Sequence, residues 1–402
     1  MSLIYKAFCR VYQKAFKVGM YLLPWREPEL VKGTGAVKQL PDVIKSKGVH
    51  NVLIVTDKGL MSINLLDGLF AALTEAGVPY TVYDGVQPNP TLGNVEDAYK
   101  LYLANGCDGI VAFGGGSPMD CAKGCGVRVA RPNTALSDMR GQLKVLKKLP
   151  PLFAIPTTAG TGSETTLAAV ISNPETHEKN AINDIQLIPR VAVLDPELTI
   201  GLPGKITSTT GMDALTHAVE AYIGHSNTRE TRRAAEKAVK LIFENLETAY
   251  NDGKNLTARQ NMLEASFLAG KAFTRAYVGY VHSIAHNLGG TYGTPHGLAN
   301  AVILPYVLDY YGETAYKPLA RLAEIAGLPV MGLDSEAKAK LFIAEIRAMN
   351  ERMNIPSKFD FIKEEDLPVI AARALKEGNP LYPVPKIMDM ADCTAVIRSF
   401  MA

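Results

Sequence analysis

The sequence predicts an α/β domain followed by an all-α domain. Short apolar runs rich in β-branched residues alternate with helical patterns over residues 30–200. After residue 206 almost no segment has the pattern of a strand, while long helical patterns continue. A chain of 402 residues is also too long for one hydrophobic core, so two domains are expected.

Five runs in the first half have the length and composition of buried strands: residues 51–56, 80–84, 109–113, 151–156 and 191–195. Residues 58–76 and 91–105 lie between such runs and repeat their apolar side chains at a helical spacing. The order strand, helix, strand favours a parallel sheet that is covered by helices on both faces.

Helical patterns in the second half cover six segments: 206–223, 227–250, 257–274, 316–326, 335–353 and 364–376. Gly201, Pro203 and Gly204 interrupt the pattern between the two halves and mark the expected boundary. We expect three parts, namely an amphipathic helical extension over residues 1–27, an α/β domain over 28–203 and an all-helical domain over 204–402.

The composition excludes several classes of protein. Charged residues make up 20% and leave a net charge of +2, so no strong field indicates a nucleic-acid partner. No apolar run is long enough for a transmembrane helix. Five scattered cysteines, an odd number, fit a reducing compartment better than a disulfide framework. We expect a cytoplasmic protein.

The N-terminal segment combines basic and apolar residues. Lys6, Arg10, Lys14 and Lys17 alternate with apolar side chains, without the continuous apolar run of a secretory signal. Such a helix can lie on a membrane surface. We favour docking onto its own protein or onto a second subunit.

A glycine-rich turn follows the strand at 109–113. Gly114, Gly115 and Gly116 would let the backbone approach a phosphate closely, and a helix N-terminus would present free N–H groups to it. Ser117 is expected as the N-cap and Pro118 as the first helical residue. Without other support, a tight turn that binds no ligand explains the same residues.

Other polar residues follow strand ends in the same domain. Asp57 comes after the strand at 51–56, where its carboxylate could accept hydrogen bonds from ribose hydroxyls and repel a 2′-phosphate. Asp57 precedes the glycine-rich turn, whereas the usual dinucleotide fingerprint places the acid after it, so a plain turn residue remains an alternative. Residues 156–164 form a second hydroxyl-rich and glycine-containing stretch after a strand.

The second half contains a set of metal-ligand residues. Asp213 and His217 are four apart, so they share one face of a helix, and His282 and His286 repeat that spacing. His296 follows a glycine-rich turn. Imidazoles with one carboxylate suit Fe²⁺ or Zn²⁺, although spacing does not decide which four of the five residues bind. Core histidines hydrogen-bonded to backbone are the alternative.

The order of the motifs resembles the iron-containing (group III) alcohol dehydrogenase family from about residue 28 to the C-terminus. The motifs are TDKG, GGGSPMD, PTTAGTGSE, DPELT, GMDALTHAVEAY and HSIAHNLGGTYGTPHG. The resemblance implies a Rossmann-like dinucleotide-binding domain, an all-α metal-binding domain and a homodimer, as in the dehydroquinate synthase-like fold. It implies hydride transfer between a small alcohol or carbonyl compound and NAD, with NADP still possible.

The resemblance also implies roles for individual residues. It makes Asp213, His217, His282 and His296 the ligands of an iron or zinc ion, and it makes His286 a catalytic proton relay. It places Phe273 in the substrate pocket. The residues that it places along the cofactor are Asp57, Gly114, Gly115, Gly116, Ser117, Thr157, Thr158, Lys179 and Leu198.

The chain departs from the family pattern at two positions. Arg275 and Tyr277 stand where many relatives have Asn and Gly. Arg275 could bind an acidic substrate, as a hydroxyacid-oxoacid transhydrogenase would require, but a neighbouring acid or the other subunit is a simpler partner. Glycerol dehydrogenase and dehydroquinate synthase-like chemistry are alternatives on the same scaffold. A metal-dependent hydrolase is the alternative from another class, and it would bind no nicotinamide.

Overall fold

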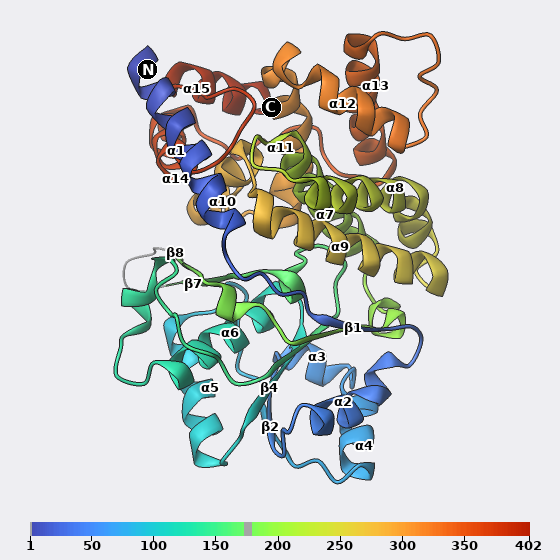
Figure 1. The fold of residues 1–402 in the computed structure, drawn as a ribbon. Coiled ribbons are helices and arrows are strands. Elements are labelled where there is room, and N and C mark those ends of the chain that lie inside the picture. The colour runs from blue at the N-terminus through green and yellow to red at the C-terminus, as the bar shows by residue number, and fades with distance from the viewer. Residues whose placement is uncertain (1, 173–178) are drawn as a thin grey trace. The chain divides into compact units, whose positions relative to one another are not determined.

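The computed structural model describes residues 2–172 and 179–402, which form two compact units (Figure 1). One unit is Pro24–Gly201 and the other combines Met1–Leu23 with Leu202–Ala402. The first is an α/β unit and the second is helical, as the sequence predicts. The N-terminal segment therefore belongs to the same unit as the C-terminal half.

The α/β unit is built on a six-stranded sheet in which every pair is parallel. Its strands, from one edge to the other, are β1 (Glu29–Lys32), β9 (Val191–Leu194), β6 (Leu152–Pro156), β4 (Gly109–Gly114), β2 (Val52–Val55) and β3 (Tyr80–Tyr83). The five predicted strands are confirmed. β1, at the edge, was not predicted because only two of its four residues are apolar and its side chains are mostly exposed.

Alternate residues of the central strands face two separate cores. Leu53 and Ile110 pack in the core under α5 (Leu92–Ala104) and α6 (Gly116–Ala130). Ile54 and Phe113 pack in the core on the other face, where α2 (Leu40–Ser46) and α4 (Asp67–Glu75) lie (Figure 1). The sheet is covered on both faces because its strands have no polar side to turn toward water.

Two details of this unit differ from the prediction. The helix expected at 58–76 is divided into α3 (Lys58–Ser62) and α4, because Asn64 takes a left-handed conformation with φ 56°. A second sheet was not predicted, and it consists of three short strands: β5 (Gly141–Gln142), β8 (Lys179–Asn183) and β7 (Ala168–Ser172).

The helical unit contains no strand among its described residues. Its helices after the boundary are α7 (Gly204–Ile223), α8 (Arg229–Asn251), α9 (Leu256–Ala276), α10 (Tyr280–Tyr292), α11 (His296–Tyr311), α12 (Glu313–Ile325), α13 (Ser335–Arg352), α14 (Leu367–Gly378) and α15 (Met390–Ser399). The helices α10, α11 and α15 lie outside the six predicted segments. α7 packs against α8, α9 and α11, so nearly all of its side chains are buried.

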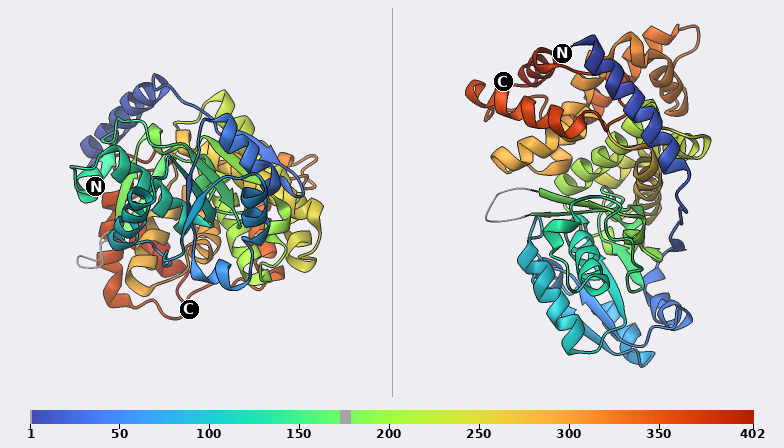
Figure 2. Two further views of the ribbon diagram at one scale, coloured as in Figure 1. Left: turned by 90° about the horizontal axis from the view of Figure 1, so that it is seen from below. Right: turned by 60° about the vertical axis from the view of Figure 1, so that its left-hand side comes forward.

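The N-terminal helix α1 (Leu3–Tyr21) lies on the helical unit (Figure 2). The guanidinium of Arg10 donates to the carbonyl oxygens of Val384 and Pro385, at 2.6 and 2.7 Å. The ammonium of Lys17 donates to the carbonyl of His225 at 2.9 Å. These contacts agree with the expectation that the helix docks onto its own protein.

No helix among the described residues is long and apolar enough to cross a membrane.

Close packing of α11 on α7 depends on Gly297. A methyl group added at this position would lie 2.5 Å from the carbonyl oxygen of Thr209 on α7, so the two helices would have to separate. We expect Gly297→Ala to lower the free energy of unfolding by about 1–3 kcal/mol, measured by urea denaturation. Gly290→Ala on α10 is the matched control, because a methyl group there meets nothing within 4 Å. Equal stability of the two variants would contradict the packing described.

Candidate active site

Four metal-ligand side chains come together in the helical unit. α7 contributes Asp213 and His217, which lie one turn apart on its buried face, while α10 contributes His282 and α11 contributes His296. One ligand atom from each residue lies within 4.8 Å of the other three. The first three residues are buried, whereas the side chain of His296 is 38% exposed. The group is therefore accessible from one side.

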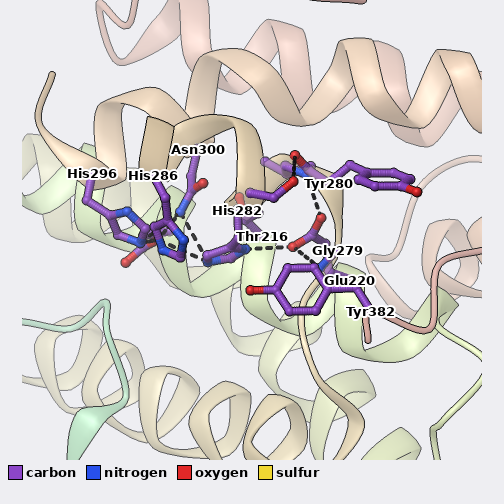
Figure 3. Close-up of polar contacts among 12 residues, drawn as sticks. Thr216, Glu220, Gly279, Tyr280, His282, His286, His296, Asn300 and Tyr382 are labelled. Carbon is purple, nitrogen blue, oxygen red and sulfur yellow. Dashed lines mark hydrogen bonds and ion pairs between the residues drawn. The ribbon is translucent and has the colours of Figure 1, made fainter. Parts of the chain in front are cut away.

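His286, the fifth candidate, is not one of the four. It follows His282 by one turn, and its ring stacks on that of His296 with centroids 5.2 Å apart (Figure 3). Its Nδ1 atom lies 2.7 Å from a carboxylate oxygen of Glu377 on α14. The structure therefore separates His286 from the other histidines, which spacing alone did not do.

A buried carboxylate on α7 holds His282. Glu220 accepts hydrogen bonds from the backbone N–H groups of Gly279 and Val281, both at 2.8 Å, and lies 2.6 Å from Nδ1 of His282 (Figure 3). A carboxylate at Nδ1 fixes the ring so that the lone pair of Nε2 points to the opposite side. That side carries Asp213, whose Oδ1 is 3.9 Å from Nε2.

Sequence analysis missed Glu220, although a signal exists. Glu220 follows Asp213 and His217 at positions i+7 and i+3, so all three share one face of α7. An acidic residue on the apolar face of a helix needs a partner.

Burial shifts the pKa values of this group. It raises the pKa of Glu220 to about 8, against the three hydrogen bonds that favour the carboxylate. Burial, with the neighbouring His217, His296 and His286, holds the pKa of His282 well below its ordinary value. His282 is therefore neutral, and a neutral imidazole is the form that binds a metal ion.

The side-chain amide nitrogen of Asn300 lies among the candidate ligand atoms, at a position where a cation would be favoured. Its Nδ2 atom lies 2.6 Å from Oδ1 of Asp213, 3.2 Å from Nε2 of His282 and 3.1 Å from Nε2 of His296. A positively polarised group thus sits where three ligand atoms converge. Imidazole nitrogens and a carboxylate oxygen suit Fe²⁺ or Zn²⁺, so the residues present fit a divalent metal ion. Sequence analysis missed Asn300, which lies one turn after His296.

Phe273, from α9, covers one side of the group. Its ring stacks on that of His217, with centroids 4.1 Å apart and an interplanar angle of 13°. The residue expected in a substrate pocket therefore lies directly beside a candidate ligand.

In the α/β unit, the glycine-rich turn leads into α6 as expected, but its N-cap was predicted wrongly. The helix begins at Gly116 and Gly115 is the N-cap, so Ser117 lies inside the helix and its Oγ accepts from the backbone N–H of Asn89 at 3.3 Å. The helix starts early because Gly114, at φ 145°, makes the turn. A methyl group there would lie 2.5 Å from Cγ of Pro118.

The turns after β4 and β6 lie together at the carboxyl edge of the sheet. The N–H of Thr157 donates to the carbonyl of Gly114 at 3.2 Å, and a methyl group on Gly115 would lie 3.2 Å from Oγ1 of Thr158. Asp57, after β2, is half-buried and caps α3 by accepting from the N–H of Leu60 at 3.0 Å. The edge therefore combines amide, hydroxyl and carboxylate groups, as a dinucleotide requires.

Two other candidate cofactor residues are placed less clearly. Leu198 is buried in the core on one face of the sheet. The side chain of Lys179 lies outside the described residues.

Lys123 on α6 is a further residue that sequence analysis missed. It is fully buried, and its ammonium donates to the carbonyl oxygens of Ser163, Thr166 and Ala168 at 2.7, 3.0 and 2.8 Å. It thereby ties the hydroxyl-rich stretch at 156–164 to the helix that follows the glycine-rich turn. The sequence signal that could have indicated its role is a lysine that lies among small residues in α6.

Comparison with known proteins decides the family. Residues 28–196 match iron-containing alcohol dehydrogenase, and residues 207–401 match the C-terminal region of the Fe-containing alcohol dehydrogenase family. The chain belongs to the iron-containing alcohol dehydrogenase family. It is an oxidoreductase that interconverts an alcohol and a carbonyl compound, and the family uses a divalent metal ion and NAD.

Similar proteins cover nearly the whole chain. A 1,3-propanediol dehydrogenase from Klebsiella pneumoniae is 43% identical over 91% of this chain and 95% of its own length. An NAD-dependent methanol dehydrogenase from Bacillus methanolicus is 37% identical over 92% and 98%. A solved structure of a 1,3-propanediol oxidoreductase matches with a TM-score of 0.91 at 39% identity, covering 94% of this chain and all of that chain.

Both residues that depart from the family pattern contact other residues of the chain. Arg275 pairs with Glu230 at 2.6 Å, in agreement with the expectation that a neighbouring acid is its partner. Tyr277 ends α9 with φ 65°, a conformation that favours glycine, and its ring packs edge-on against Phe16 of α1 with centroids 5.4 Å apart. The substitution by Tyr is thus linked to the N-terminal helix that lies outside the family pattern.

We expect Glu220→Gln to weaken binding of Fe²⁺ or Zn²⁺ about 10- to 100-fold. Three N–H groups converge on the carboxylate, and an amide offers only one oxygen to accept them, so the orientation of His282 is no longer fixed. Competition with a chromophoric chelator measures the affinity. Glu345→Gln, which removes a partner of Arg352 on α13, is the control and should leave the affinity unchanged. Equal affinities in the two variants would show that Glu220 does not orient a ligand.

Proposed function

We propose that this enzyme holds a divalent metal ion, iron or zinc, through Asp213, His217, His282 and His296. The observation that carries the proposal is the approach of their four ligand atoms to within 4.8 Å, with Glu220 behind His282 and the Nδ2 atom of Asn300 where the ligand atoms converge. Such a metal ion, when bound, polarises the oxygen of an alcohol or carbonyl group. The remaining chemistry belongs to residues of the chain.

His286 is proposed as the proton relay of the reaction. Oxidation of an alcohol releases a hydride from carbon and a proton from oxygen, and the hydride passes to NAD. The side chain of His286 is 31% exposed and its ring is stacked on His296, so it can pass a proton between the candidate metal site and water. Phe273 covers His217 and would restrict the space for the carbon chain of the substrate.

The α/β domain of residues 28–203 is proposed to bind NAD at the carboxyl edge of its sheet. The residues proposed to contact it are Asp57, Gly114, Gly115, Gly116, Ser117, Thr157, Thr158, Lys179 and Leu198. The N-terminus of α6 follows the turn at Gly114–Gly116, and its free N–H groups favour binding of the pyrophosphate. A carboxylate at Asp57 favours NAD over NADP, because it repels a 2′-phosphate.

A small, uncharged alcohol or aldehyde is the proposed substrate. The similar proteins are named for 1,3-propanediol and methanol. Arg275, the one residue that suggested an acidic substrate, is paired with Glu230. The hydrolase alternative is set aside because the chain belongs to a dehydrogenase family.

We also propose a cytoplasmic homodimer in which residues 204–402 form the metal-binding domain. The five cysteines are all buried and unpaired, which suits a reducing compartment. Light scattering on the purified chain tests the dimer.

A panel of alcohols and aldehydes tests the proposed function. Protein loaded separately with Fe²⁺ and Zn²⁺ is assayed with short primary alcohols, diols and hydroxyacids, following the absorbance of the reduced nicotinamide with NAD and with NADP. We expect turnover of short alcohols or diols with NAD, and its loss after treatment with a chelator. Activity only on hydroxyacids, or unchanged activity without metal, would refute the proposal.

Replacement of His286 tests the proton relay. We expect His286→Ala to lower kcat about 100-fold or more, because a positioned acid–base group contributes a factor of that size. Steady-state kinetics with the best alcohol of the panel measures it. His50→Ala, which removes an exposed histidine paired with Asp108, is the control and should retain normal kcat. A normal kcat in His286→Ala would exclude the role.

A further inference from the structure

A second carboxylate in the helical unit faces His286. Glu377 lies on α14, which packs against α10, and its Oε1 atom is 2.7 Å from Nδ1 of His286. Both side chains are 31% exposed, so the pair lies at the rim of the candidate site and not in the core. A contact of this length joins an imidazole N–H to a carboxylate oxygen.

Tyr382 holds the carboxylate of Glu377 in place. Its hydroxyl donates to the same oxygen, Oε1, at 2.9 Å. Burial and the charge of Glu377 raise the pKa of Tyr382 well above its ordinary value, so the hydroxyl keeps its proton and remains a donor. One carboxylate oxygen therefore receives two hydrogen bonds, one from the buried tyrosine and one from the histidine.

The N-terminal helix fixes the segment that carries Tyr382. The buried side chain of Gln13 donates to the carbonyl oxygen of Tyr382 at 2.8 Å. Arg10 donates to the carbonyl oxygens of Val384 and Pro385, two and three residues further along the chain. At the other end, the N–H of Tyr382 donates to the carbonyl of Gly378 at 2.6 Å. The support of His286 thus runs from α1 through Tyr382 to Glu377.

We propose that Glu377 is the positioning residue of the proton relay, holding His286 with Nδ1–H as donor so that Nε2 is the atom that exchanges the proton. Tyr382 and α1 keep Glu377 in the position that this requires. The proposal rests on the role of His286 proposed above. Glu377 acts through His286 and does not itself exchange a proton with the substrate.

The chemistry of imidazole explains why such a partner matters. A neutral imidazole has two tautomers, and only one of them leaves a lone pair on Nε2. A carboxylate at Nδ1 selects that tautomer, holds the ring, and stabilises the imidazolium that forms when Nε2 takes the proton. His282, one turn earlier, is held in the same way by Glu220, but its Nε2 faces Asp213.

A double-mutant cycle on the full-length, metal-loaded enzyme tests the proposal. The variants are Glu377→Ala, His286→Ala and the two combined, with Glu345→Gln as control, and kcat, KM and bound metal are measured for each. We expect Glu377→Ala to lower kcat about tenfold or more, with little change in KM and with metal retained. In the His286→Ala background, Glu377→Ala should have almost no further effect, because the group that it positions is gone.

Two conservative variants separate positioning from folding. Glu377→Gln keeps the size of the side chain and one acceptor oxygen, so its kcat should lie between those of the wild type and of Glu377→Ala. Tyr382→Phe removes only the hydroxyl and should lower kcat less than Glu377→Ala does. If Glu377→Ala does not fold, the cycle is carried out with Glu377→Gln.

The outcomes distinguish this proposal from the one on which it rests. A loss of kcat in His286→Ala, together with normal kcat in Glu377→Ala or additive losses in the double variant, would overturn the role of Glu377 alone. Normal kcat in His286→Ala would overturn both. Loss of bound metal in Glu377→Gln would show a general structural role and would also overturn the proposal.

Discussion

The buried carboxylate of Glu220 is the interaction on which the candidate metal site depends. It joins α7 to the start of α10, because its two oxygens accept hydrogen bonds from the N–H groups of Gly279 and Val281. One of these oxygens also lies 2.6 Å from Nδ1 of His282. A buried carboxylate is costly unless it is hydrogen-bonded, and the start of α10 supplies the N–H groups that satisfy Glu220. Asp213 and His217 lie on the same face of α7 and thereby meet His282.

The two histidines of α10 are distinguished by their carboxylate partners. His282 is buried and is held by Glu220 (Figure 3). Its Nε2 lies 3.9 Å from Oδ1 of Asp213. His286 is partly exposed and is held by Glu377. The same residue type, one turn apart on one helix, is thus suited to a metal ligand in one position and to proton exchange with water in the other.

Features that depend on a short stretch of sequence could be predicted. The buried strands β2, β4 and β9 follow from short, continuous apolar runs, and the shared helix face of Asp213 and His217 follows from their spacing. The N-cap of α6 was assigned wrongly because Gly114 makes a turn that only glycine allows, and this moves the start of the helix. Glu377 could not be found from the sequence, because it meets His286 only through the packing of α14 on α10, across 91 residues.

Four residues, and not His286, are proposed to hold the metal ion. Metal content per chain, measured by elemental analysis on protein purified with Fe²⁺ or Zn²⁺, tests this proposal most directly. We expect close to one ion per chain in the wild type and in His286→Ala. We expect loss of the ion in Asp213→Ala, His217→Ala, His282→Ala and His296→Ala, each folded by circular dichroism. Full metal content in folded His282→Ala, or loss of metal in His286→Ala, would contradict the proposal.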